Sequence, residues 1–145
     1  MKTVRDLLQA KKSPDVWSVP PDTLVYRALQ LLNEKGIGAL LVMEKGELVG
    51  IVSERDYARK VILHGKSSKE LTVGEIMTSP VVCADPAWSA HDCMAMMSQW
   101  RVRHLPVIVD GQVVGVISIG DVVSAVVSEQ ASTIRNLEHY IASGS

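Results

Sequence analysis

A helical spacing of apolar residues followed by two β-rich runs occurs twice along the chain. In the first half, the apolar positions on one helix face are Leu24, Ala28, Leu31 and Leu32, and the runs are Ala39–Met43 and Leu48–Val52. In the second half, the corresponding positions are Ala90, Cys93, Met94 and Met97, and the runs are Leu105–Val109 and Val113–Ser118. Short apolar stretches, predicted as strands, precede the two helices at Val16–Val19 and Val81–Ala84. With a closing helix, each half has the order β-α-β-β-α.

The two halves align without a gap when the chain is shifted by 65 residues, so that Trp17–Val61 falls on Val82–Val126. Turn and glycine positions coincide, as in the pairs Pro21 and Pro86, Gly46 and Gly111, and Gly50 and Gly115. The chain is therefore a duplicated unit. A unit of roughly 60 residues buries its apolar surface poorly when alone, so the two are expected to pack against each other. The predicted fold class is α/β (α+β).

Polar segments suggest where the units begin and end. The expected divisions are residues 1–66 for the first unit, 67–130 for the second and 131–145 for a C-terminal helix or tail. Each unit starts with a predicted lead-in helix, Val4–Leu8 or Val73–Met77. Extra residues within Lys11–Asp15 predict an exposed loop. The pair Asp110-Gly111 predicts a type I′ hairpin turn, because both central residues of that turn need a positive φ.

Composition and charge narrow the classes of partner. The chain has 145 residues, of which 47% are hydrophobic and 21% charged, and this balance argues against disorder. Its net charge of −1 argues against a protein that works mainly by binding nucleic-acid phosphates or anionic lipid. Apolar runs of about 18 residues, which a membrane span needs, are missing. The start of the chain, Met1–Lys12, has no apolar signal-peptide core, so we expect a cytoplasmic protein.

The sequence contains no motif that predicts catalysis or a metal site. Cys83 and Cys93 are expected to be small apolar residues in a reducing compartment, and the four histidines lack metal-ligand spacing. Nucleophile–base and dinucleotide-binding motifs are missing as well. The stretch Gly65–Ser67 imitates the end of a P-loop, but Lys60 stands where the first glycine is required. We therefore expect no catalytic residue, no metal and no enzyme activity.

Both halves carry the motif Gly-h-h-Ser-x-x-Asp, with h an apolar residue, at Gly50–Asp56 and Gly115–Asp121. A serine N-cap with an acidic residue three positions later is a capping box, which stabilises a helix start by about 1 kcal/mol. The position after a strand favours a second interpretation, because N–H groups at a helix start attract an anion. An aspartate there can also accept hydrogen bonds from ribose hydroxyls. Both interpretations stay open.

The duplicated unit and the paired motif resemble a tandem pair of cystathionine-β-synthase (CBS) domains. The stretches Gly50-Ile-Val-Ser-Glu-Arg-Asp56 and Val102-Arg-His-Leu-Pro-Val107 are similar to recurrent sequences of that family, and the resemblance covers residues 4–128. It implies two units packed about a pseudo-two-fold axis, with two clefts between them. It also implies an adenosine-containing ligand in the clefts, with AMP first and ADP, ATP, NAD or S-adenosylmethionine as further candidates.

The resemblance also implies roles for single residues. The ribose-binding aspartates, one for each cleft, are Asp56 and Asp121, and the serines beside ribose or phosphate are Ser53 and Ser118. Positions that line the adenine and phosphate region or contact the base are Gly38, Ala39, Arg103, His104, Trp17 and Val82. Arg55 is a further candidate near the first serine. The clefts are expected to differ, because Arg103 and His104 offer cationic donors and their counterparts do not. Trp17 is also explained as a core residue, and Arg55 as a solvated helix residue.

The function implied by the resemblance is a regulatory, signal-transducing module with no obligatory cofactor. Adenine nucleotide would act as the regulatory ligand, and an unidentified partner protein would distinguish the bound form. The alternative is a structural dimerisation module with empty clefts. A homodimer is expected because CBS pairs commonly associate into flat dimers. In addition, the helix Val122–Val127 is apolar almost all round and needs more burial than one chain provides.

Overall fold

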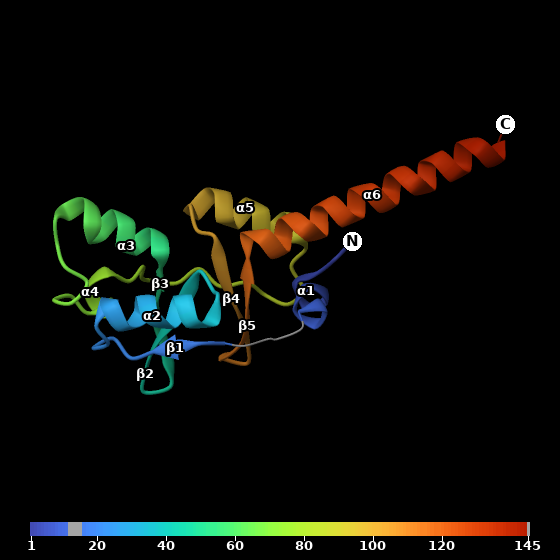
Figure 1. Cartoon of the computed structure of the whole chain (residues 1–145). Helices are drawn as coiled ribbons and strands as arrows, with labels where there is room; N and C mark the ends of the chain where they lie inside the picture. The colour runs from blue at the N-terminus through green and yellow to red at the C-terminus, as the bar shows by residue number, and fades with distance from the viewer. Residues whose placement is uncertain (12–15, 145) are drawn as a thin grey trace. The chain divides into compact units, whose positions relative to one another are not determined.

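The computed structural model describes residues 1–11 and 16–144, which form two compact units (Figure 1). The inner unit comprises the described residues from Val16 to Val81. The outer unit comprises the residues up to Lys11 together with those from Val82 onward. These two names refer to order along the chain. Apart from Lys11, the predicted loop Lys11–Asp15 lies outside the described residues.

The inner unit contains a three-stranded sheet in the order β1-β2-β3. The strands are β1 (Ser18–Val19), β2 (Ala39–Glu44) and β3 (Glu47–Ser53). The helices are α2 (Val25–Lys35), α3 (Glu54–Lys60) and α4 (Val73–Ile76), with a 3-10 turn, η1 (Ile62–His64). β1 is parallel to β2, and β2 is antiparallel to β3. The buried face of α2 carries Val25, Ala28 and Leu32, and Leu24 is its exposed N-cap rather than a member of that face.

The outer unit contains a two-stranded antiparallel sheet and three of the described helices. The strands are β4 (His104–Val109) and β5 (Gln112–Ser118), and the helices are α1 (Val4–Ala10), α5 (Ala90–Trp100) and α6 (Ile119–Gly144). All five elements contribute buried residues to its hydrophobic core. The turn at Asp110 and Gly111 follows the prediction, since φ is positive at both residues, and the turn of the first hairpin has the same geometry at Lys45 and Gly46.

The strand predicted at Val81–Ala84 does not form, and the cause is Pro106. In the inner unit, the N–H of Leu41 donates to the carbonyl of Trp17 (3.0 Å) and joins β1 to β2. In the second repeat, Pro106 occupies the position of Leu41 and has no N–H to donate. The ladder is therefore reduced to one parallel bridge, between Ala84 and Val107.

Each lead-in helix packs within the unit formed by the other repeat. α1 precedes the first repeat but lies in the outer unit, and α4 precedes the second repeat but lies in the inner unit. Leu8 of α1 covers Gly115, where a Cβ atom would come within 2.5 Å of a Leu8 methyl carbon. Met77, directly after α4, covers Gly50 in the same way. The compact units thus divide the chain differently from the expected boundary at residue 66, because the motif glycines leave the depressions that the lead-in segments fill.

The segments predicted as a closing helix and a separate C-terminal helix form one continuous helix, α6. Between Asp121 and Ala142 the sequence has neither glycine nor proline to end it. Val122 and Ala125 are buried in the outer unit, whereas Val123 and Val127 are exposed. Among the described helices, none combines the length and the hydropathy that crossing a membrane requires.

The contact between α1 and β5 predicts that Gly115→Ala destabilises the protein. The added methyl group would overlap Leu8, so we expect the free energy of unfolding, measured with urea, to fall by about 1–3 kcal/mol. Gly120→Ala is the matched control, because the atom nearest to its new Cβ is Ser118 Oγ at an ordinary 3.6 Å. Combining Gly115→Ala with Leu8→Ala should cost less than the two single changes together. Strict additivity would contradict the contact.

Candidate functional site

The first strand-to-helix corner lies where β3 ends and α3 begins. Ser53 is the N-cap: its N–H donates to Asp56 Oδ2 (2.9 Å), and the Asp56 N–H donates to Ser53 Oγ (3.3 Å). This reciprocal pair is the capping box expected from the sequence. Ala39 is paired with Ser53 across the sheet, and the Gly38 carbonyl accepts from the Glu54 N–H (3.4 Å). The structure therefore brings four of the predicted residues together.

The carboxylate of Asp56 is engaged on both oxygens. Oδ1 accepts a hydrogen bond from the Thr78 hydroxyl (3.2 Å) and lies 3.3 Å from the Lys60 ammonium, while Oδ2 is bound by Ser53. Lys60 also donates to the Ile76 carbonyl (2.8 Å). Sequence reasoning missed both partners. The i,i+4 spacing of Asp56 and Lys60 is a usable signal, but nothing local connects Thr78 to this corner.

At the second corner, β5 leads into α6 with the same geometry. The Ser118 N–H donates to Asp121 Oδ2 (2.8 Å), and the Asp121 N–H donates to Ser118 Oγ (3.2 Å). The ammonium of Lys11 donates to the same Oδ2 (2.9 Å) and to the Val116 carbonyl (2.8 Å). Among the described residues, the hydrogen bonds to this carboxylate all end on Oδ2, and none of them reaches Oδ1. Lys11, placed by the sequence in an exposed loop, is half-buried and contacts the predicted site.

The start of β4 and the residue before it supply the other two predicted residues. His104 is paired with Ser118, and the Arg103 carbonyl accepts from the N–H of Ile119 (2.8 Å). The Arg103 residue is exposed, and His104 is half-buried. Both residues therefore adjoin the Ser118–Asp121 corner, as Gly38 and Ala39 adjoin the first corner.

Two pKa values at the second corner lie below their ordinary range. Burial acts to raise the pKa of Asp121, but hydrogen bonds from Ser118 and the Lys11 ammonium outweigh it, and the net pKa is lowered. Burial, followed by the charge of Lys11, lowers the pKa of His104. The lowered pKa favours the neutral imidazole, so a cationic role for His104 stays a prediction that its surroundings do not favour. For Arg103 the same role also stays a prediction.

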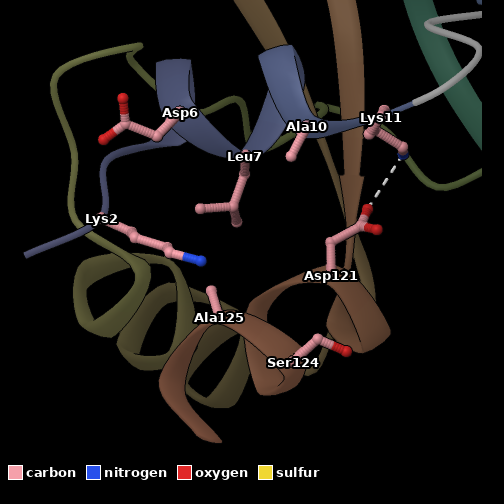
Figure 2. A pocket seen from close by; sticks show the side chains of 8 residues that line it. All are labelled: Lys2, Asp6, Leu7, Ala10, Lys11, Asp121, Ser124 and Ala125. Carbon is pink, nitrogen blue, oxygen red and sulfur yellow. Dashed lines mark hydrogen bonds and ion pairs between the residues drawn. The ribbon is translucent and has the colours of Figure 1, made fainter. Parts of the chain in front are cut away.

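A pocket of about 280 Å³ lies between α1 and α6 in the outer unit (Figure 2). Its lining residues are Lys2, Asp6, Leu7, Ala10, Lys11, Asp121, Ser124 and Ala125. Leu7 points into it from α1, and the Asp121 carboxylate stands at its edge beside Lys11. The volume is near the lower limit of typical small-molecule pockets, about 300 Å³. Carboxylates and ammonium groups at one apolar pocket suit a ligand that carries both hydroxyls and an anionic group.

The remaining candidates occupy packing positions. Trp17 is half-buried against the core of the inner unit, and the Lys35 ammonium lies 4.1 Å from the centre of its ring system. Val82 is half-buried against the core of the outer unit. Arg55 is half-buried in the first turn of α3. Packing therefore accounts for Trp17 and Val82, and contact of these two with a base stays a prediction.

Comparison with known proteins identifies the repeated unit. The family model described as CBS domain matches residues 4–63 and 73–128. The mitochondrial CBS domain-containing protein CBSX3 of Arabidopsis thaliana is 41% identical over 151 residues, which cover 98% of this chain and 73% of that protein.

Solved structures with CBS domains are also similar. A putative signal-transduction protein with CBS domains from Burkholderia ambifaria is 47% identical, with a TM-score of 0.85 over 89% of this chain and 96% of that one. The CBS domain pair of protein MJ0100, in complex with 5′-methylthioadenosine and S-adenosyl-L-methionine, is 26% identical, with a TM-score of 0.75 over 88% of this chain and 98% of that one. These similarities confirm the mixed α/β fold with tandem repeated units.

The environment of His104 predicts a measurable titration. By NMR, its pKa should lie below 6.5, and Lys11→Met should raise it because a nearby cation is lost. Since the folded-state pKa is the lower one, stability should fall as pH drops from 6.5 toward that value, and less steeply in Lys11→Met. Lys2→Met, which removes another lysine from the same pocket, serves as control. An unchanged His104 pKa in Lys11→Met would contradict this account.

Proposed function

The chain belongs to the CBS domain family, and from this premise we propose that it is a regulatory module that binds an adenosine-containing ligand at its strand-to-helix corners. CBS domain pairs are regulatory modules, and the related pair of MJ0100 holds 5′-methylthioadenosine and S-adenosyl-L-methionine. The observation that carries the proposal is the carboxylate of Asp121. Its Oδ1 receives no hydrogen bond from the described residues, and the side chain borders the pocket in the outer unit.

A ribose matches this carboxylate chemically. An ionised aspartate is an acceptor only, and a ribose presents hydroxyl donors to it. Ser118 and Lys11 fix Oδ2, so Oδ1 is held in place for a hydroxyl group at little cost in side-chain entropy. The low pKa of Asp121 keeps the acceptor ionised at neutral pH, and a hydrogen bond to a charged acceptor is stronger than a neutral one.

Charge around the second corner favours a ligand with phosphate. Lys11 and Lys2 border the pocket, and the exposed Arg103 adjoins the same corner. AMP is therefore the first candidate, with ADP, ATP and NAD sharing its adenosine and phosphate. S-adenosylmethionine fits less well here, because its sulfonium and amino groups are cationic. Binding regulates an activity when a partner protein has different affinity for the bound form.

The two corners should bind with different affinities. At Asp56 both oxygens already have partners, so a ribose hydroxyl must displace Thr78 or Lys60 from Oδ1. At Asp121 the corresponding oxygen accepts directly. We therefore propose that the Asp121 corner fills first and that the Asp56 corner binds more weakly.

One observation favours a structural module as the alternative. The same capping box occurs at three helix starts for which no ligand is proposed, namely Thr3–Asp6, Thr72–Glu75 and Ser89–Asp92. A capping box alone is therefore no sign of a ligand. The two corners differ from these three in their partly buried carboxylates at the end of a hairpin, and this difference supports binding.

Calorimetric titration with AMP tests the proposal. We expect Asp121→Ala to weaken the tighter site at least about tenfold and Asp56→Ala to remove the weaker one, each leaving the other site largely intact. Asp92→Ala is the matched control, since it removes the same kind of cap from α5 and should cost about 1 kcal/mol of stability without affecting AMP. All variants are first shown to be folded by circular dichroism.

The Asp92→Ala control distinguishes a ligand-binding module from a structural one. If folded Asp121→Ala and Asp56→Ala bind AMP like the unmodified chain and like Asp92→Ala, the aspartates are helix caps only. If the unmodified chain binds none of AMP, ADP, ATP, NAD and S-adenosylmethionine at millimolar concentration, the structural module is correct.

A further inference from the structure

Apolar side chains on α6 follow a coiled-coil spacing on a face that the outer unit does not cover. Steps of four and three residues alternate through Val123, Val127, Gln130, Ile134, Leu137 and Ile141, hereafter the α6 seam. A 4-3 alternation is the heptad pattern of a helix that packs against another helix. The apolar members of the seam are 45–69% exposed. The seam therefore has the pattern of an interface, and the described residues of the single chain leave it uncovered.

The buried face of α6 and the seam are different faces of the helix. Val122 and Ala125 belong to the core of the outer unit, and the Lys2 N–H donates to the carboxylate of Glu129. Beyond that point the helix projects from the outer unit (Figure 1), and every residue from Ser132 to Ala142 is exposed. The first two seam residues thus lie on an anchored part of α6, and the last three lie on the projecting part.

We propose that the α6 seam pairs with the α6 seam of a second copy of this chain in a parallel, two-stranded coiled coil. In heptad terms, the a positions are Val127, Ile134 and Ile141, and the d positions are Val123, Gln130 and Leu137. Every a position is β-branched, and Leu137 is at d, which is the combination that favours two parallel strands.

Gln130 fixes the orientation. In a parallel, in-register pair, each d residue faces its own copy, so the two Gln130 amides can hydrogen-bond to each other. In an antiparallel pair, d residues face a residues, and Gln130 would be buried against an aliphatic side chain with its amide unsatisfied. A single polar pair in an apolar seam therefore selects the parallel register.

The flanking positions do not oppose this pairing. The e and g residues along the seam are Ser124, Val126, Ala131, Thr133, Glu138 and Tyr140. Glu138 is the one charged residue among them, and its g neighbour on the second helix is Thr133, so no like charges meet. Arg135 and Glu129 stand at outer heptad positions. Tyr140, 76% exposed, extends the apolar surface beside Ile141.

The exposed area suits a weak, reversible dimer. If full burial of one aliphatic side chain removes on the order of 100 Å², five half-exposed seam residues contribute on the order of 250 Å² per copy, or about 500 Å² for two copies. Stable interfaces bury about 1,200 Å² or more, so we expect the pairing to depend on protein concentration. Because α6 is already anchored at Glu129, pairing requires little new ordering of the helix.

Light scattering of the full chain tests the pairing. We expect a mass of twice 15.8 kDa, and the chain mass alone for the double variant Ile134→Glu with Leu137→Glu, because four carboxylates would meet in the seam. Ser132→Glu with Arg135→Glu is the matched control on the outer face and should stay dimeric. Truncation after Ala131 gives a second test that leaves both cores intact and should also yield monomers.

Cysteine substitution tests the orientation. Oxidised Gln130→Cys should form a disulfide-linked dimer, whereas Ser132→Cys on the outer face should not. A monomeric unmodified chain, a mass of three or more chains, or a seam variant that remains dimeric would overturn the proposal, and failure of Gln130→Cys to link would overturn the parallel register. AMP binding by the monomeric variant is measured separately, so the two proposals can fail independently.

Discussion

Both units depend on the packing of a lead-in helix onto the glycine of a hairpin from the other repeat. Leu8 lies against Gly115, and Met77 lies against Gly50, each with no room for a Cβ atom. The same helices contribute buried side chains to the two cores. Val4 and Leu7 of α1 belong to the core of the outer unit, and Val73 and Ile76 of α4 belong to the core of the inner unit. The glycine of the repeated motif is therefore a packing requirement, and the serine and aspartate after it are placed by that packing.

Each lead-in helix packs within the unit formed by the other repeat, and this exchange of lead-in helices also builds the candidate site. The segment after α1 brings Lys11 to Asp121, and the segment after α4 brings Thr78 to Asp56. In each unit, a residue that follows a lead-in helix thus contacts the aspartate of the motif. A cation at one corner and a hydroxyl at the other make the two corners chemically different. This inequality is additional to the one expected from Arg103 and His104.

Features with local causes could be predicted from the sequence. The turn at Asp110-Gly111 and the capping boxes follow from short-range backbone chemistry, and the duplication follows from glycine spacing. The absence of a strand before α5 was also predictable from Pro106, because this residue has no N–H and stands where the N–H of Leu41 donates a hydrogen bond in the first repeat. The exchange of lead-in helices could not be predicted, since both carry the same threonine-to-acid cap and differ only in which distant depression they fill. The charge state of His104 likewise depends on burial and on Lys11, which is remote in sequence.

The exchange has a consequence for synthesis on the ribosome. The inner unit is continuous in sequence, so its core can close as soon as Val81 has left the exit tunnel. The core of the outer unit needs both Val4 and Val122, which are far apart in the sequence and are therefore synthesised at different times. At a synthesis rate of about 5–20 residues per second, on the order of ten seconds pass between the synthesis of α1 and that of the helix α6 against which it packs. During that interval a nascent chain exposes Val4 and Leu7, and chaperones that bind apolar segments have access to α1.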